Sequence, residues 1–240
     1  MDVIDSATFR TRRSDWVAQL VALKMRSTAD EYPDREISPI VLFGLLNKAM
    51  TGKPVDYVCD VGNHQMCAAQ SLRLGKNQTA HYSGGMGAMG FALPASLGVA
   101  LSSGRKTIVI TGDGSLQLNI QELDTLKRQQ PNVAIIVMNN HSLGMVKNFQ
   151  DMYFDGRNQS TKVGYNCPSF TDLARAYGIN SLHISSRAEL ATAIEKIAFA
   201  AEPILLEVGM PYATECHPRL AFGKKLDEQV PTQTSSARVT

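Results

Sequence analysis

The feature that most constrains the fold of this sequence is a set of short apolar runs without alternation of apolar and polar residues. Val133–Met138 is apolar at every position, and Thr107–Thr111 and Ile204–Val208 are nearly so. Such strands are buried on both faces, because a half-exposed strand would place a polar residue at every second position. Helix-compatible segments separate the runs, so the sequence predicts a doubly wound α/β fold, with a mainly parallel sheet and helices on both faces.

Helix signals occupy the segments between these runs. At Ser38-Pro39 a serine in the N-cap position precedes a proline at the first helical position, a pattern typical of a helix start. Ser186 and Glu189 have the spacing of a capping box, which predicts another helix after Ser186. Further helices are expected at Ser14–Met25, residues 63–72, Ala92–Ser102, Ser115–Gln129 and Ser169–Tyr177, a further strand at Val55–Asp60, and a polar loop after Val133–Met138.

Composition and charge exclude several classes of protein. Hydrophobic residues make up 44% of the 240 positions and charged residues 19%, which is ordinary for a globular protein. The net charge is +2 with both signs interspersed, so we expect no nucleic-acid partner. No apolar run approaches the roughly 18 residues that a membrane span needs, so we expect no membrane association.

The cysteines and the chain ends indicate the setting and the domain organisation. The four cysteines show neither CxxC pairing nor zinc-like spacing with histidines. Residues 1–20 lack the apolar core of a signal peptide, and these features favour a reducing, cytoplasmic setting. Residues 1–36 are predicted to be a lead-in or linker with one helix, residues 37–223 the α/β domain, and residues 224–240 a polar C-terminal tail.

The polar residues that follow the predicted strands indicate where a ligand binds. In a doubly wound sheet, ligands bind beyond the carboxyl ends of the strands. The segments at these positions are CDVGNHQ (59–65), TGDGS (111–115) and MNNHSLGM (138–145). Each brings glycine or polar side chains to the point where a strand ends, so together they define the candidate site.

Two of these segments suit a divalent cation and a diphosphate. Asp113 offers a carboxylate oxygen and Asn140, 27 residues later, an amide oxygen. Because neighbouring parallel strands have their carboxyl ends on the same side of the sheet, we expect these oxygens to lie close together. A small number of protein oxygen ligands is typical of Mg²⁺, whose remaining ligands are water and phosphate oxygens. Gly112 and Gly114 permit tight turns and close backbone approach. Ser115 begins a helix whose free N–H groups favour a phosphate, so the segments predict a metal–diphosphate site.

Each half of this pattern also has a plainer interpretation. Asp113 alone is typical of a helix cap or a turn residue. Asn139-Asn140 alone is typical of a plain turn. The two together, at matching strand ends and beside glycine-rich turns, favour the metal–diphosphate site.

A second glycine cluster offers a competing interpretation. Gly85, Gly87 and Gly90 match the GxGxxG pattern of dinucleotide-binding folds, and Asp113 follows Gly90 by 23 residues, close to the spacing of a ribose-binding acid. Two features count against it. The preceding residues, GKNQTAHYS, do not form an apolar strand, and Asp113 opens a phosphate-like turn of its own.

The segments around these residues resemble those of a known family. The segment GDGS followed by NN is similar to the signature of thiamine diphosphate enzymes. The wider segments DVGNHQMCAAQ, SGGMGAMGFALPASLGVAL, GDGSLQLNIQEL and MNNHSLGMVKNFQ resemble the catalytic subunit of acetolactate synthase. The resemblance runs from about Trp16 to about Val208 and covers only the C-terminal, diphosphate-binding domain of that family.

The resemblance implies a metal and diphosphate role for one group of residues. Asp113, the Asn140 side chain and the Ser142 carbonyl would bind Mg²⁺. The residues that would hold the diphosphate are Gly114, Ser115, Asn63 and His64.

A second group is implied to orient the rings of the cofactor. Met89 stands where the family has an apolar wedge that bends the cofactor, and the Gly87 carbonyl would accept a hydrogen bond from its 4′-amino group. Gly144, Met145 and Val146 would line the pocket beside the thiazolium ring. Without the resemblance, the methionines would be typical of a core, and His64 of a structural histidine.

The chain departs from the family at three positions. Asn63 replaces the usual glutamine with a shorter amide, and Phe149 replaces the tryptophan usual in the pocket that selects the acceptor substrate. His81 lies just before the glycine cluster and has no assigned role. The change at Phe149 puts the acceptor in doubt and leaves the cofactor chemistry unaffected.

The resemblance implies an enzyme that uses thiamine diphosphate and Mg²⁺ to decarboxylate a 2-oxo acid and to join the remaining fragment to a second carbonyl compound. The alternatives are a non-ligating 2-oxo acid decarboxylase or a subunit of a keto-sugar carboligase. More remote alternatives are a Rossmann NAD oxidoreductase and a domain that binds a cofactor or partner without catalysis.

One half of such a site is expected to come from elsewhere. The family's activating glutamate belongs to a pyrimidine-binding domain, and no candidate segment for it occurs here, since Glu122, Glu189 and Glu195 lie on predicted helices and Glu207 lies in the last strand. The FAD-binding middle domain is also absent, so FAD is expected only where that domain is supplied. We therefore expect a pyrimidine-binding domain or subunit as partner, in a homo- or hetero-oligomer.

Overall fold

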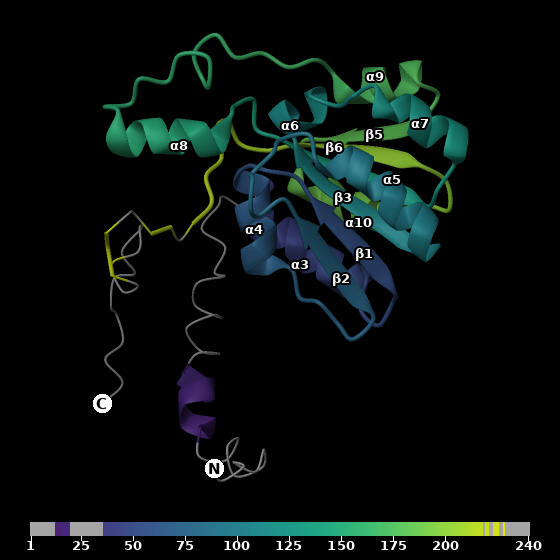
Figure 1. Cartoon of the computed structure of the whole chain (residues 1–240), viewed down its shortest axis with the longest axis horizontal. Helices are drawn as coiled ribbons and strands as arrows, with labels where there is room; N and C mark the ends of the chain where they lie inside the picture. Colours follow the sequence, from purple (N-terminus) through teal and green to yellow (C-terminus); the bar gives the residue numbers. More distant parts are fainter. Residues whose placement is uncertain (1–12, 20–35, 218, 221–222, 226–227, 229–240) are drawn as a thin grey trace.

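The apolar runs form the centre of a parallel sheet whose strands all have their carboxyl ends on the same side. The computed structural model describes residues 13–19, 36–217, 219–220, 223–225 and 228. Its six-stranded sheet has the order β2-β1-β3-β4-β6-β5 (Figure 1). Every neighbouring pair is parallel. The strands are β1 (Val55–Cys59), β2 (Gln78–Tyr82), β3 (Lys106–Gly112), β4 (Val133–Asn139), β5 (Asn180–Ile184) and β6 (Ile204–Gly209).

Helices cover both faces of this sheet, which confirms the doubly wound fold predicted from the unbroken apolar strands. Successive residues of β4 alternate between two separate cores: Ile136 packs with α3 (Pro39–Ala49) and α10 (Arg187–Phe199), whereas Ile135 packs on the opposite face. Of the other helices, α4 (Asn63–Ser71) lies on the face of α3, and α5 (Ala92–Ser103), α7 (Glu122–Gln129) and α9 (Phe170–Ala176) lie on the face of Ile135.

The edge strands β2 and β5 were not among the predicted strands. Their sequences, QTAHY and NSLHI, mix polar and apolar residues, and most of their side chains are only partly buried. An edge strand has one neighbour and less cover, so it needs no continuous apolar run. The residues before the glycine cluster therefore do form a strand, β2, although it is not an apolar one.

The predicted polar loop after β4 contains a helix, α8 (Gly144–Tyr153), that projects beyond the sheet edge (Figure 1). It buries little of itself against the described residues, since only Gly144 and Asn148 are fully covered. An i,i+4 ion pair between Lys147 and Asp151 stabilises it. Its apolar side chains Val146, Phe149 and Tyr153 are exposed, so the apolar face of α8 does not pack on this sheet.

The predicted helix Ser115–Gln129 is two helices, α6 (Asp113–Gln117) and α7, separated by turns. The break lies where the Asn119 side chain donates to the Gly90 carbonyl at 2.8 Å, which draws the chain toward the glycine cluster. A continuous helix would carry Asn119 away from that contact.

The predicted helix starts differ in outcome. The Ser38 hydroxyl accepts the Val41 N–H, as predicted for an N-cap. The Glu189 carboxylate accepts the Ser186 backbone N–H, as in a capping box, but the Ser186 hydroxyl donates to that carboxylate at 2.7 Å and makes no N-cap bond, so only half of the capping box forms. Within Ser14–Met25, residues 14–19 are helical and exposed, and residues 20–25 lie outside the described part.

No helix in the described part of the chain combines the length and apolar character that crossing a membrane requires.

Glu207 is a buried carboxylate that joins β6 to two other elements. One oxygen accepts from the Asn139 side chain at 2.9 Å at the end of β4. The other accepts the N–H groups of Phe170 and Thr171 at 3.1 and 3.2 Å, at the start of α9. A carboxylate satisfies these donors together because it has only acceptor oxygens.

We therefore expect Glu207→Gln to lower the free energy of unfolding by about 1–3 kcal/mol, since its NH₂ group would face a donor and leave it unpaired. Urea denaturation measures this value. Glu202→Gln, at an exposed position, is the matched control and should be neutral. Equal stability of Glu207→Gln and the parent protein would contradict this role.

Candidate functional site

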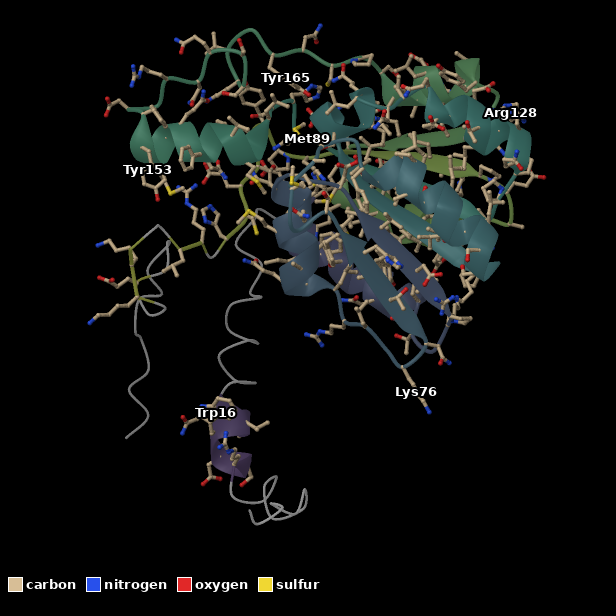
Figure 2. The ribbon with its side chains drawn as sticks, in the orientation of Figure 1. Trp16, Lys76, Met89, Arg128, Tyr153 and Tyr165 are labelled. Atoms are coloured by element: carbon tan, nitrogen blue, oxygen red, sulfur yellow. The ribbon has the colours of Figure 1, made fainter. Side chains whose placement is uncertain are left out.

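A cavity of about 240 Å³ lies beyond the carboxyl ends of β1, β3 and β4, where the three polar segments converge. Figure 2 shows Met89 at this end of the sheet, with Tyr165 above it on the segment that follows α8. The predicted site residues that line the cavity are Asn63, His64, Gly87, Met89, Asp113, Gly114, Ser115, Asn140, Ser142, Gly144, Met145 and Val146. Sequence reasoning and the resemblance thus selected residues that the fold brings together.

Asp113 places a buried carboxylate at the cavity. It follows the last residue of β3, and its Oδ2 accepts the Ser142 N–H at 3.1 Å. Burial raises the pKa of Asp113 to about 6, and contacts with the Tyr165 hydroxyl and the Gly114 and Ser142 N–H groups offset only part of that rise. None of these contacts brings a positive charge to the carboxylate. A divalent ion would supply the missing positive charge.

Asn140 brings its amide to the same place from the end of β4. Its Nδ2 donates to the Thr214 carbonyl at 3.1 Å. The adjoining turn is held by the positive φ of His141 (52°) and by the Ser142 hydroxyl, which donates to the Thr161 carbonyl at 2.9 Å. The Ser142 N–H bond to Asp113 draws this turn against β3, so the predicted metal ligands are neighbours.

His64 is packed between two glycine backbones. A Cβ at Gly62 would lie 2.6 Å from its ring and a Cβ at Gly112 would lie 2.8 Å from it. Gly112 has an ordinary φ of −106°, so its role is to make room for His64 rather than to form the tight turn predicted. Burial lowers the pKa of His64 to about 4, and its buried Nε2 has no hydrogen-bond partner. A phosphate oxygen would give this nitrogen a partner once it carries a proton.

Asn63 and Ser115 already use part of their hydrogen-bonding capacity on the protein. Asn63 Nδ2 donates to the Thr214 carbonyl at 3.1 Å. The Ser115 hydroxyl donates to the Val61 carbonyl at 2.7 Å. The single hydroxyl proton of Ser115 is therefore engaged within the fold, and a diphosphate would meet mainly N–H groups at this helix start.

Two residues singled out by the sequence lie outside the cavity. Phe149 is 43% exposed on α8, and its ring contacts Tyr153 and Phe154 with centroids 4.7 and 5.9 Å apart. The structure does not place it among the cavity-lining residues, so its assignment to a substrate pocket remains a prediction. His81 lies on edge strand β2, with Nε2 3.3 Å from the Thr79 hydroxyl.

Sequence reasoning missed Asp60, although its position after a buried strand could have revealed it. Its carboxylate accepts the N–H groups of Gly90 and Ala92 at 2.9 and 3.0 Å. It thereby gives the free N–H groups at the start of α5 a hydrogen-bond acceptor and connects the glycine cluster to the end of β1. Leu143 and Thr214 also line the cavity, and Thr214 contributes through a carbonyl that every residue type has.

These contacts bear on the competing dinucleotide interpretation. A Rossmann pyrophosphate would lie at the start of the helix that follows the glycines, and the Asp60 carboxylate occupies that position here. β1 also separates β2 from β3, so the glycine cluster does not join neighbouring strands. The geometry disfavours dinucleotide binding, although a strand does precede the glycines.

Comparison with known proteins decides the family. Residues 60–208 match the profile described as thiamine pyrophosphate enzyme, C-terminal TPP binding domain. The chain belongs to this family. The matched residues begin directly after β1 and include the carboxyl ends of β3 and β4, so they contain the polar segments at the cavity apart from Cys59.

The curated relatives include large subunits of acetolactate synthase. Isozyme 2 of Escherichia coli (strain K12) is 36% identical over 78% of this chain and 34% of its own length. The protein of Lactococcus lactis is 32% identical over 92% of this chain and 38% of its own length. The chain thus spans about a third of the length of these relatives.

A solved structure supports the same fold. The thiamine diphosphate-dependent 4-hydroxybenzoylformate decarboxylase of Rhodococcus jostii RHA1 superposes with a TM-score of 0.66 at 25% identity, over 77% of this chain and 34% of that one. The doubly wound sheet is therefore that of a thiamine diphosphate-binding domain.

The raised pKa of Asp113 predicts a pH dependence for the metal-free protein. An acid whose pKa is higher in the folded state, here about 6 against about 3.9 unfolded, stabilises the fold below pH 4. That contribution is lost as pH rises to about 6, and we expect it to amount to roughly 2–3 kcal/mol. Asp113→Asn should lack this loss.

Urea denaturation of both proteins in chelator at pH 4.5 and 7 tests this. The difference between them isolates Asp113, because His64 titrates in both. Identical pH dependence of the two would contradict the assignment.

Proposed function

We propose that this chain supplies the diphosphate- and metal-binding half of a thiamine diphosphate-dependent site. That site would decarboxylate a 2-oxo acid and join the remaining fragment to a second carbonyl compound, as in acetolactate synthase. The single observation that carries the proposal is the convergence of Asp113, Asn140 and Ser142 at the cavity that Met89 and His64 also line.

The donor set fits Mg²⁺. The Asp113 carboxylate, the Asn140 amide oxygen and the Ser142 carbonyl are hard oxygen ligands, and phosphate oxygens and water would complete an octahedral shell. Among the described residues, no three His, Cys, Asp or Glu side chains converge as a zinc site would require. One carboxylate with neutral oxygens is the set expected for a cation that arrives with a diphosphate.

The surroundings of the metal ligands fit the diphosphate and the rings. A Cβ at Gly114 would lie 2.3 Å from Leu143 Cδ2, so this glycine leaves room for the Leu143 side chain beside the cavity. Its N–H, the start of α6, and the Nε2 of His64 would meet phosphate oxygens, with Asn63 beside them.

The thiamine diphosphate would supply the nucleophilic carbon and the electron sink for decarboxylation. This chain's own residues would orient it: Met89 as an apolar support between the rings, and the Gly87 carbonyl as an acceptor for the amino group. Gly144, Met145 and Val146 would shield the reacting centre from water on the α8 side.

The proton-activating glutamate would come from a pyrimidine-binding domain or subunit. None of Glu122, Glu189, Glu195 and Glu207 lines the cavity, and Glu207 has the structural role described above. Val146 and Phe149 are 46% and 43% exposed where α8 leaves the cavity, so apolar surface is available there for that partner. We expect a homo- or hetero-oligomer, with FAD only where a middle domain is supplied. The four unpaired cysteines are compatible with a reducing, cytoplasmic setting.

A second candidate is a 2-oxo acid decarboxylase that releases the fragment as an aldehyde. Two observations favour it: the structural similarity to a thiamine diphosphate-dependent decarboxylase and the phenylalanine at position 149. A keto-sugar carboligase subunit shares the same cofactor chemistry and differs in its acceptor.

Cofactor binding tests the central proposal. In calorimetry, the chain should bind thiamine diphosphate with Mg²⁺ and should not bind NAD. Asp113→Ala should abolish the Mg²⁺-dependent part, because it removes the only charged metal ligand. Undiminished Mg²⁺-dependent binding in this variant would refute the proposed metal site. Asp172→Ala, at an exposed position, is the control.

The product tests the choice between the two candidates. With a pyrimidine-binding partner present and pyruvate as substrate, we expect acetolactate in excess over free acetaldehyde. Phe149→Trp should raise this ratio several-fold if position 149 lies near the acceptor, since the larger ring restores the family's residue. Aldehyde as the main product would favour the plain decarboxylase, and an unchanged ratio in Phe149→Trp would place residue 149 away from the acceptor.

A further inference from the structure

Beyond β6, residues 210–217, here called the strap, cross the carboxyl end of β4. Met210 N–H donates to the Asn139 carbonyl at 2.8 Å, and Ala213 N–H donates to the Asn140 carbonyl at 2.8 Å. The strap therefore follows the turn that carries Asn140. It is held to that turn by backbone hydrogen bonds, which are independent of side-chain identity.

A tight turn in the strap directs one carbonyl at two predicted site residues. The Thr214 N–H donates to the Pro211 carbonyl at 3.0 Å, the Thr214 hydroxyl donates to the same oxygen, and Ala213 has a φ of 53°. The Thr214 carbonyl then accepts the Nδ2 groups of Asn63 and Asn140, each at 3.1 Å. Both of its lone pairs are thus used by the two amides.

These bonds determine which way each amide points. The oxygen and nitrogen of a side-chain amide are fixed on opposite sides of one planar group, so holding the nitrogen also orients the oxygen. With its nitrogen on Thr214, Asn140 turns its oxygen away from the strap. That orientation leaves the oxygen available as a metal ligand.

Glu215 fastens the strap to α8. Its carboxylate pairs with Lys147 at 2.7 Å and with Arg219 at 2.9 Å. Lys147 also pairs with Asp151 at 2.7 Å. The Lys147 side chain is only 13% exposed, so its pair with Glu215 is less screened than an ordinary surface pair.

We propose that the strap is a positioning element for the metal and diphosphate site, in which the Thr214 carbonyl orients Asn140 and Asn63 and the Glu215–Lys147 ion pair holds that carbonyl in place. This inference rests on the proposed function. It assigns Glu215 and Lys147 a role in cation affinity although neither lines the cavity. Residues that orient metal ligands in this way typically change metal affinity by about 10- to 100-fold when substituted.

The test measures binding of Mn²⁺ to the full chain by electron paramagnetic resonance, in the presence of thiamine diphosphate. Glu215→Gln keeps the size of the side chain and weakens its bond to Lys147. We expect about a tenfold loss of Mn²⁺ affinity, with a melting temperature close to that of the parent protein. Glu215→Asp retains the charge and should recover part of the affinity.

Two further variants separate positioning from loss of negative charge. Asp151→Asn removes a carboxylate from the same lysine without touching the strap, so it should have little effect on Mn²⁺ affinity. The double variant K147M/E215Q keeps the net charge but lacks the ion pair, so the loss should persist. A loss in Asp151→Asn equal to that in Glu215→Gln, or full recovery in the double variant, would show a charge effect and overturn the proposal.

The result for the parent protein separates the two hypotheses. If the parent binds Mn²⁺ with thiamine diphosphate and Glu215→Gln binds it equally well, the positioning role is wrong and the proposed function stands. If the parent protein binds neither Mn²⁺ nor thiamine diphosphate, the proposed function fails, and the positioning role fails with it.

Discussion

The parallel pairing of β3 with β4 is the constraint on which the site depends. Their register places Gly112 opposite Met138, so Asp113 and Asn139-Asn140 leave the sheet at the same level. Both strands are buried along their whole length, which fixes this register through two cores at once. The polar residues at the strand ends are close together because the apolar residues before them cannot shift without exposing a core.

The site is built from buried polar groups that the fold only partly satisfies. Asp113 is a buried carboxylate whose pKa is raised by burial, and His64 is a buried neutral ring with one unpartnered nitrogen. Each such group costs stability in the absence of a ligand. A cation and a diphosphate would satisfy them together, which accounts physically for a cavity that combines one charge with several neutral oxygens.

The strands β1, β3, β4 and β6 and the polar residues at their ends could be predicted because each has a local signal: unbroken apolar runs, and glycines or polar residues at strand ends. Met89, Met145 and Val146 have no such signal and were assigned by the family resemblance. The edge strands β2 and β5 lack such a signal, since partial burial permits polar residues. The projecting helix α8 was taken for a loop because its apolar residues do not pack on this sheet. Phe149 was assigned to a pocket by resemblance, and here it lies exposed on that helix.

By itself the sequence determined the layered fold, the family resemblance and the set of residues at the strand ends. The reason is that residue types alone show which strands are buried on both faces and which side-chain atoms can bind a ligand. Only the tertiary structure decided that Gly112 makes room for His64, that Asp60 occupies the start of α5, and that the Thr214 carbonyl holds two amides. These roles depend on which backbone atoms meet across the fold. A carbonyl or a missing Cβ has no signature in the sequence until its neighbour is known.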